Sequence, residues 1–281
     1  MSRVIGRWNA FWFGEIPAIR LAAFQQALLF TLVFYLIERW RFAGEWLTVA
    51  GFHPSAGLDS TYSPQLPLVP EGWLAVFGVV LFAATGLAIF GVMRRIMLWV
   101  TLGLVVWVTH VDPISAFTLN RLYMFVLLIL ALAPPVRGGV QAAWPVRMLQ
   151  IHLVVHYLSA GACKVRHGDW ISQSDVLWMQ VQGVYMTDAA AFLVRTLPGW
   201  GWTGLQHMAL GFELVAPVLF MVRRLRWVGI VVGAGLHLVV ALTMYQLIYF
   251  SLQMMCFYLL FVDARILERG RARLGLGDQD R

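Results

Sequence analysis

The chain has few charged residues, and this shortage excludes an ordinary soluble protein. Charged side chains make up 12% of the 281 residues, whereas hydrophobic ones make up 60%. A soluble domain usually carries about 25% charged residues. The apolar residues also stand in long uninterrupted blocks. We therefore predict a membrane protein.

Cysteine is also scarce, and its scarcity excludes two further classes. Only Cys163 and Cys256 occur, and we expect them at different depths of the membrane. A disulfide framework is excluded, and neither cysteine belongs to a metal-ligand spacing. The net charge of +7 does not require a nucleic-acid partner, because no basic groove motif with interleaved aromatics accompanies it.

The long apolar runs predict an all-α, polytopic transmembrane helix bundle of about eight spans. The first run, 18–37, covers about 30 Å of helix, which is enough to cross a bilayer and too long for the apolar region of a signal peptide. We treat residues 1–281 as one transmembrane domain. Its predicted spans are 18–37, 73–93, 96–111, 115–133, 147–165, 205–222, 227–244 and 247–263.

The orientation follows from the arginines. If there are eight spans, most arginines fall in loops on one side of the membrane, and most acids fall in the opposite loops. Positive loops mark the cytoplasmic side, so we predict that both termini are cytoplasmic. The long outer segment 166–204 holds four tryptophans, which favour the membrane interface. We expect it to lie across the outer mouth of the bundle, and we expect the proline-containing segment 38–72 to be largely irregular.

Ionisable residues inside the predicted spans are the candidates for function. Such a group costs at least about 2.5 kcal/mol at mid-membrane and therefore needs a reason. The topology places three of them near mid-depth and others nearer the outer surface. Residues from four helices can then converge on one outward-facing cavity. They are His156, Glu213 and His237 at mid-depth, and Arg121, Lys164 and His207 toward the outside, with the polar Asn120 next to Arg121 in sequence.

Lys164 is the only lysine in the chain, which otherwise uses arginine for positive charge. Lysine can lose its proton when it is desolvated, whereas arginine stays protonated. This difference favours a chemical role, although a side chain that extends to the lipid headgroups explains a lone lysine equally well. His152 and His156 leave two readings open, a metal or haem site and hydrogen bonds between helices.

The stretch around Lys164 resembles a known family. The sequence YLSAGACKVRHGDW is similar to the signature of the HTTM domain, the membrane region shared with vitamin K-dependent gamma-carboxylase. The similar features are Tyr157, the Ala160-Gly161 step, Lys164 and Trp170. The opening EIPAIRLAAFQQALLF and the late helix GLHLVVALTMYQLIYF fit the same family, so the resemblance covers nearly the whole chain.

The resemblance implies an enzyme that uses a membrane quinol, such as reduced menaquinone or a vitamin K-like quinol. By position, Lys164 would be the base, and His237 and Glu213 would assist it. Tyr157, His156, His207, Asn120 and Arg121 would then contact the cofactor. The substrate would be a peptide or small molecule on the outer side of a bacterial cytoplasmic membrane.

Two alternatives from other classes stay open. One is a non-catalytic membrane protein that binds or matures a partner. The other is electron transfer through a haem with histidine ligands. A scaffold should tolerate arginine in place of Lys164, and haem would be visible in the absorption spectrum.

Overall fold

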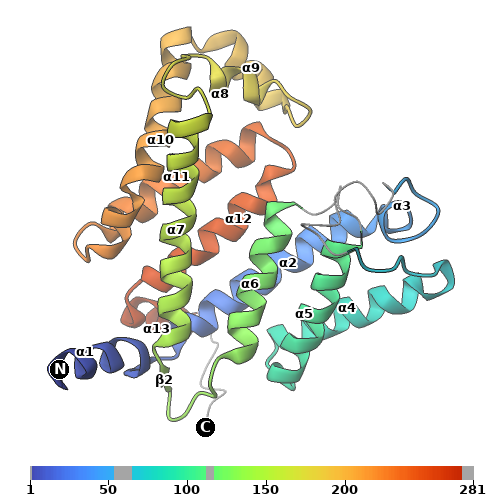
Figure 1. Ribbon diagram of the computed structural model, residues 1–281, viewed down its shortest axis with the longest axis vertical. Helices are drawn as coiled ribbons and strands as arrows, with labels where there is room; N and C mark the ends of the chain where they lie inside the picture. The colour runs from blue at the N-terminus through green and yellow to red at the C-terminus, as the bar shows by residue number, and fades with distance from the viewer. Residues whose placement is uncertain (1, 54–64, 112–116, 274–281) are drawn as a thin grey trace. The chain divides into compact units, whose positions relative to one another are not determined.

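The computed structural model describes residues 2–53, 65–111 and 117–273, and it confirms the all-helical prediction for these residues. They contain thirteen α-helices and two strands of three residues each. The chain divides into two compact units (Figure 1). Unit 1 consists of residues 1–12 and 146–281, and unit 2 consists of residues 13–145.

Unit 2 is built from antiparallel apolar helices and a small β-ribbon. Strands β1 and β2 pair antiparallel, with Ile16 opposite Gln141. The turn between α4 and α5 needs left-handed backbone at Gly91 and Met93, whose φ angles are 76° and 44°. The elements are β1 (Glu15–Pro17), α2 (Ile19–Trp40), α3 (Ala43–Leu47), α4 (Leu74–Ile89), α5 (Arg94–His110), α6 (Thr118–Leu132) and β2 (Val140–Ala142), with a 3-10 turn at Glu71–Trp73.

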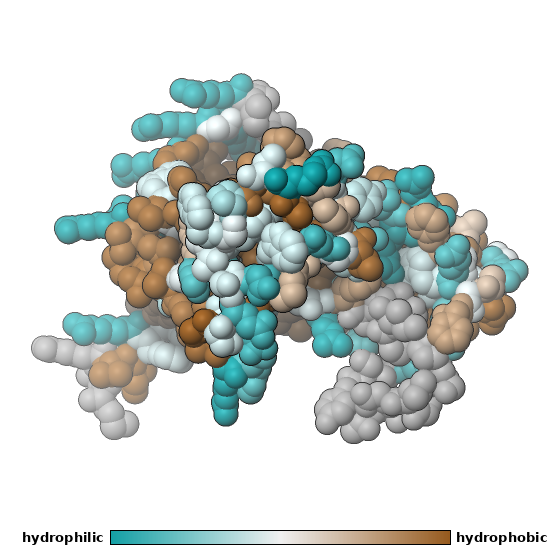
Figure 2. All heavy atoms as spheres, turned by 90° about the horizontal axis from the view of Figure 1, so that it is seen from above, coloured by the Kyte–Doolittle hydropathy of each residue, from teal (hydrophilic) through white to brown (hydrophobic). Residues whose placement is uncertain are grey.

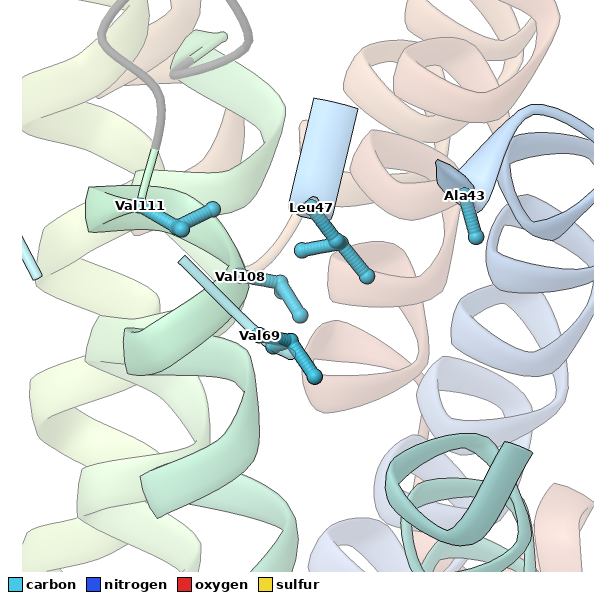
Figure 3. Packing of buried hydrophobic residues seen from close by; sticks show 5 residues of the cluster. All are labelled: Ala43, Leu47, Val69, Val108 and Val111. Carbon is cyan, nitrogen blue, oxygen red and sulfur yellow. The ribbon is translucent and has the colours of Figure 1, made fainter. Parts of the chain in front are cut away.

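One hydrophobic cluster of unit 2 joins the segment after α2 to the end of α5. Leu47 of α3 and Val111 are completely buried, and Val69 and Val108 lie beside them (Figure 3). Val69 also donates its backbone N–H to the Leu47 carbonyl at 2.8 Å. Segment 38–72 was predicted to be largely irregular. Helix α3 interrupts its described part, while its residues 54–64 lie outside the described residues.

Unit 1 holds one long helix and the three apolar helices that follow it in sequence. The short α8 and α9 lie between α7 and α10. The elements are α1 (Ser2–Phe13), α7 (Trp144–His167), α8 (Val176–Val181), α9 (Asp188–Thr196), α10 (Gly199–Met221), α11 (Arg226–Thr243), α12 (Leu247–Tyr258), a 3-10 turn at Leu259–Phe261 and α13 (Ala264–Arg273).

Each predicted span corresponds to a helix, although the helices differ in length. Four are long and apolar enough to cross a membrane, namely α2, α4 with its preceding turn, α10 and α11. The bent pair of α12 and α13 raises that number to five if it forms one span. Helix α5 has 17 residues and α6 has 15, or about 25 Å and 22 Å of helix. The predicted start of the fourth span, at residue 115, lies outside the described residues.

Many large apolar side chains lie on the surface, as a lipid-facing protein requires. Brown, hydrophobic residues reach the surface beside the charged ones in Figure 2. On α11, Val231 is 66% exposed and Leu238 is 54% exposed. A soluble monomer rarely exposes large contiguous apolar patches. The outward faces of these helices therefore match an apolar solvent better than water.

Candidate functional site

Lys164 and Glu213 form an ion pair between α7 and α10. The Lys164 ammonium donates a hydrogen bond to the Glu213 Oε1 atom. Their side chains are 27% and 16% exposed, so the pair is largely withdrawn from the surface. The same ammonium lies 4.3 Å from the centre of the buried Trp170 ring, a distance typical of a cation–π contact. The lone lysine is therefore held by a carboxylate and an aromatic face.

A glycine allows the two helices to come together beside this pair. Gly161 precedes Lys164 by three residues on α7 and faces α10. A Cβ atom at Gly161 would lie 3.0 Å from Leu214 Cδ2 and 3.1 Å from Glu213 Cβ. Both distances are shorter than ordinary van der Waals contact, so a larger residue would push α10 away. The Ala-Gly step of the sequence motif thus has a packing reason.

The chain reverses after α7, and this reversal brings Trp170 back over Lys164. Helix α7 ends at His167, and Asp169 adopts a left-handed backbone with φ of 55°. The fully buried Gln206 of α10 then fixes the segment. Its Nε2 donates to the Trp170 carbonyl at 2.9 Å and to the Gln173 carbonyl at 2.7 Å.

Glu213 has one carboxylate oxygen that no group satisfies among the described residues. Its Oε2 atom is buried and has no hydrogen-bond partner there. A buried unpaired polar atom is costly, by about 1–3 kcal/mol, and often marks a place where a ligand or water binds. Pro217 lies four residues later in α10 and lacks an N–H, so the Glu213 carbonyl also loses its usual helical partner.

A second polar cluster lies deeper along α7, around Tyr157. The Tyr157 hydroxyl is 2.7 Å from His237 Nε2 of α11 and 2.6 Å from the Tyr258 hydroxyl of α12. All three side chains are buried. A Cβ atom at Gly233 would lie 2.3 Å from the Tyr258 hydroxyl, so only glycine leaves room for this arrangement.

The two clusters share α7 and are neighbours along it. Tyr157 and Lys164 are seven residues apart, which is about 10 Å along the helix. The sequence predicted that Lys164, Glu213 and His237 line one cavity. The structure places them in two clusters along α7, a Lys164–Glu213 pair and a Tyr157–His237–Tyr258 network. That they line one cavity stays a prediction.

The remaining predicted site residues lie in other surroundings. The His156 ring is 6.3 Å from His152 and 6.1 Å from the Phe250 ring of α12, so it packs among aromatic side chains. His207 is exposed on α10. Asn120 and Arg121 belong to unit 2, where Asn120 Oδ1 accepts a hydrogen bond from Tyr35 and Arg121 is exposed.

A separate open hollow of about 540 Å³ lies between α8, α9 and the start of α10. Three tryptophans and the Asp175 carboxylate are among its lining residues, and none of the predicted site residues is. Its lining residues are Ser174, Asp175, Trp178, Val194, Leu197, Gly199, Trp200, Trp202 and Thr203. The prediction that segment 166–204 lies across the outer mouth stays a prediction, although its described residues do form helices.

Sequence reasoning missed two residues that build the site. Tyr258 completes the deeper network, and Gln206 holds the Trp170 segment in place. Trp170 was recognised only as part of the motif, and the structure places its ring over the Lys164 ammonium. The sequence offered one indication of the Tyr258 contact, because Gly233 lies one turn before His237 and a glycine there allows another helix to approach closely. In the described part of the chain, no group of three or more His, Cys, Asp or Glu side chains is placed to hold a metal ion.

No family model, no curated protein and no solved structure matches this chain.

Proposed function

We propose that the protein is an integral membrane enzyme whose Lys164–Glu213 pair accepts a proton from its substrate or cofactor. The observation that carries this proposal is the pair itself. Its amine and carboxylate are largely withdrawn from the surface, and one carboxylate oxygen has no hydrogen-bond partner among the described residues. A group that only anchored two helices would be expected to have both oxygens satisfied.

The chemistry is proton transfer rather than nucleophilic attack. The Lys164–Glu213 pair has an ionic state and a neutral state, which differ by one proton moved from the ammonium to Glu213 Oε1. In the neutral state, a hydroxyl that donates to Glu213 Oε2 would lose its proton to this oxygen while the Oε1 proton passes to the Lys164 amine. The products would be a deprotonated hydroxyl, a protonated Glu213 and a Lys164 ammonium that the Trp170 face stabilises. Arginine cannot take part, because it stays protonated.

A membrane quinol is the cofactor that these residues fit best. Its hydroxyl would meet the unpartnered Glu213 Oε2, and its ring would suit the aromatic surroundings of Trp170 and Phe212. A bound quinol supplies an acidic phenolic hydroxyl and reducing electrons. The resemblance to the gamma-carboxylase family supports the same choice and suggests reduced menaquinone or a vitamin K-like quinol.

We further propose eight spans with both termini in the cytoplasm of a bacterial cell, and a peptide or small-molecule substrate on the outer side. Arginines before the first span, after the last span, and between spans 2 and 3, 4 and 5, and 6 and 7 support this orientation. Reporter fusions after Arg95 and after Arg226 should read cytoplasmic, and a fusion within 175–190 should read external. An external signal from the Arg226 fusion would contradict the topology.

The functional test is binding of reduced menaquinone to the purified protein in neutral detergent. Wild type and Arg166→Gln should bind it equally, because Arg166 is exposed near the pair without joining it. Lys164→Ala and Glu213→Gln should each weaken binding at least tenfold. Equal binding by all four proteins, or none by wild type, would contradict the proposal. A haem absorption band in the wild type would favour electron transfer instead.

A further inference from the structure

Two amphipathic helices at the ends of the chain lie at the same end of unit 1. The Arg147 guanidinium of α7 is 4.9 Å from the Phe11 ring of α1. Arg147 also donates to Gln150 Oε1 at 3.1 Å. Gln150 Nε2 in turn donates at 2.8 Å to the carbonyl of Leu260, four residues before α13. These contacts connect α1, the start of α7 and the start of α13.

The turn between α10 and α11 belongs to the same end. Arg223 lies 3.9 Å from Asp263, the residue before α13. Arg226 lies 6.0 Å from the Phe261 ring and donates its Nε–H to the Phe220 carbonyl. Four segments, namely α1, the start of α7, the α10–α11 turn and the segment that leads into α13, therefore meet here.

Positive charge dominates this end of unit 1. Its acids within the described segments are Asp263 and Glu268. Its basic residues, counted from the side chains that the structure describes, are Arg7, Arg147, Arg223, Arg224, Arg226, Arg265, Arg269, Arg271 and Arg273. Most of these side chains are exposed rather than buried. This end of unit 1 therefore carries an excess of positive charge that would attract an anionic partner.

Helix α1 has an exposed apolar face beside its charge. Val4, Ile5, Trp8 and Phe11 fall on one side of the helix and are between 43% and 73% exposed. Trp8 also packs edge-on against Trp12 at 5.7 Å. Tryptophan and phenylalanine on one face with arginine on another are typical of a helix that lies in a membrane interface.

Helix α13 also has apolar and basic side chains on different sides, and its axis turns sharply away from the preceding apolar helix, as an interfacial helix requires. It bends by 112° from the apolar segment Leu247–Phe261. If that segment crosses the membrane near the normal, α13 lies close to the membrane plane. Ile266 is 45% exposed beside Leu267, and Arg265 and Arg269 lie on the adjoining side of the helix.

We propose that α1, α13 and the α10–α11 turn form one surface that binds anionic phospholipid headgroups, with both helices lying in the interface. The occupant is an anionic lipid leaflet, because the surface combines apolar side chains that can enter lipid with exposed arginines that can bind phosphates. This inference is independent of the chemistry at Lys164.

The test is hydrogen–deuterium exchange of the full chain in two kinds of nanodisc, one of phosphatidylcholine alone and one of phosphatidylcholine mixed with phosphatidylglycerol. Amides of α1 and α13 should exchange more slowly in the mixed nanodiscs, and high salt should reduce the difference. In Arg265→Gln/Arg269→Gln, the gain in protection of α13 should fall about fivefold for each arginine removed.

Two controls separate lipid binding from folding. Arg265→Lys/Arg269→Lys keeps the charge and should keep the gain in protection. Arg41→Gln/Arg195→Gln removes two exposed arginines outside this surface and should leave α13 unchanged. The proposal is overturned if wild-type α13 exchanges equally in both nanodiscs, or if the glutamine pair at 265 and 269 behaves as wild type.

Discussion

Both units bury tyrosines among apolar helices, yet the partners of these tyrosines differ. In unit 2, Tyr35 donates to the Asn120 amide oxygen at 2.6 Å, and Tyr123 shares a 2.9 Å hydrogen bond with Thr31. These partners are neutral and do not titrate near neutral pH. In unit 1, Tyr157 is hydrogen-bonded to His237 and to Tyr258.

The difference separates packing from chemistry. The phenols of unit 2 join helices through hydrogen bonds to an amide and a hydroxyl, neither of which titrates near neutral pH. The Tyr157 phenol is bonded to a histidine, a partner that can gain or lose a proton. Buried hydrogen bonds of similar length thus have different meanings, and the acid–base character of the partner decides between them.

The largest effect should come from leaving Glu213 without its cation. Lys164→Ala should lower the free energy of unfolding by about 3 kcal/mol, because a charge that is mostly withdrawn from solvent loses its partner. Lys164→Met/Glu213→Leu should recover most of this loss, since no charge remains. Unfolding in mixed micelles measures both variants. If the double variant is as unstable as the single one, the loss comes from packing and not from charge.

A smaller effect should follow from crowding the deeper network. The Cβ atom of Gly233→Ala would meet the Tyr258 hydroxyl and come within 2.8 Å of Phe212 Cζ, so we expect a loss of about 1–3 kcal/mol. Gly235→Ala is the matched control, because nothing lies within 4 Å of its Cβ position. It should be neutral or slightly stabilising. Equal destabilisation by both variants would contradict the packing described around Gly233.

A matched pair of tyrosine variants tests the comparison of the two units. Tyr157→Phe and Tyr123→Phe should each cost about 1–2 kcal/mol, since each loses buried hydrogen bonding. Only Tyr157→Phe should reduce biological activity, which complementation of a strain lacking the gene can measure. If Tyr123→Phe reduces activity as strongly at equal protein level, the distinction between the two units fails.

The smallest effect should come from the aromatic cover of Lys164. Trp170→Leu removes the ring that lies 4.3 Å from the ammonium and should cost about 0.5–2 kcal/mol. Trp178→Leu is a control for a tryptophan that lines the separate hollow. In mixed micelles, Trp170→Leu should lose more stability than Trp178→Leu. A larger loss for Trp178→Leu would contradict the contact between Trp170 and the Lys164 ammonium.

The helices were predictable from the sequence, whereas the partners of the polar residues were not. Long apolar blocks bounded by arginines and prolines determine where helices form, and each predicted span is a helix. Contact between Lys164 and Glu213 depends on the rotation and approach of α7 and α10, which hydropathy does not encode. Tyr258 was missed because one tyrosine in a run of aromatics has no distinct pattern. Within the described residues, four helices are long and apolar enough to cross a membrane, or five if the bent pair is one span. The prediction of eight spans therefore stays a prediction.

The central claim is that Lys164 works by exchanging a proton and not by its charge alone. Lys164→Arg keeps the ion pair with Glu213 and the contact with Trp170, because arginine pairs with carboxylates and stacks on aromatic rings. The direct measurement is whether Lys164→Arg complements a strain that lacks the gene. The comparison is made where the variant and the wild type have equal protein levels and equal stability. We expect Lys164→Arg to fold normally and to lose activity at least tenfold. Full activity of a normally folded arginine variant would contradict the claim and leave the pair a structural contact.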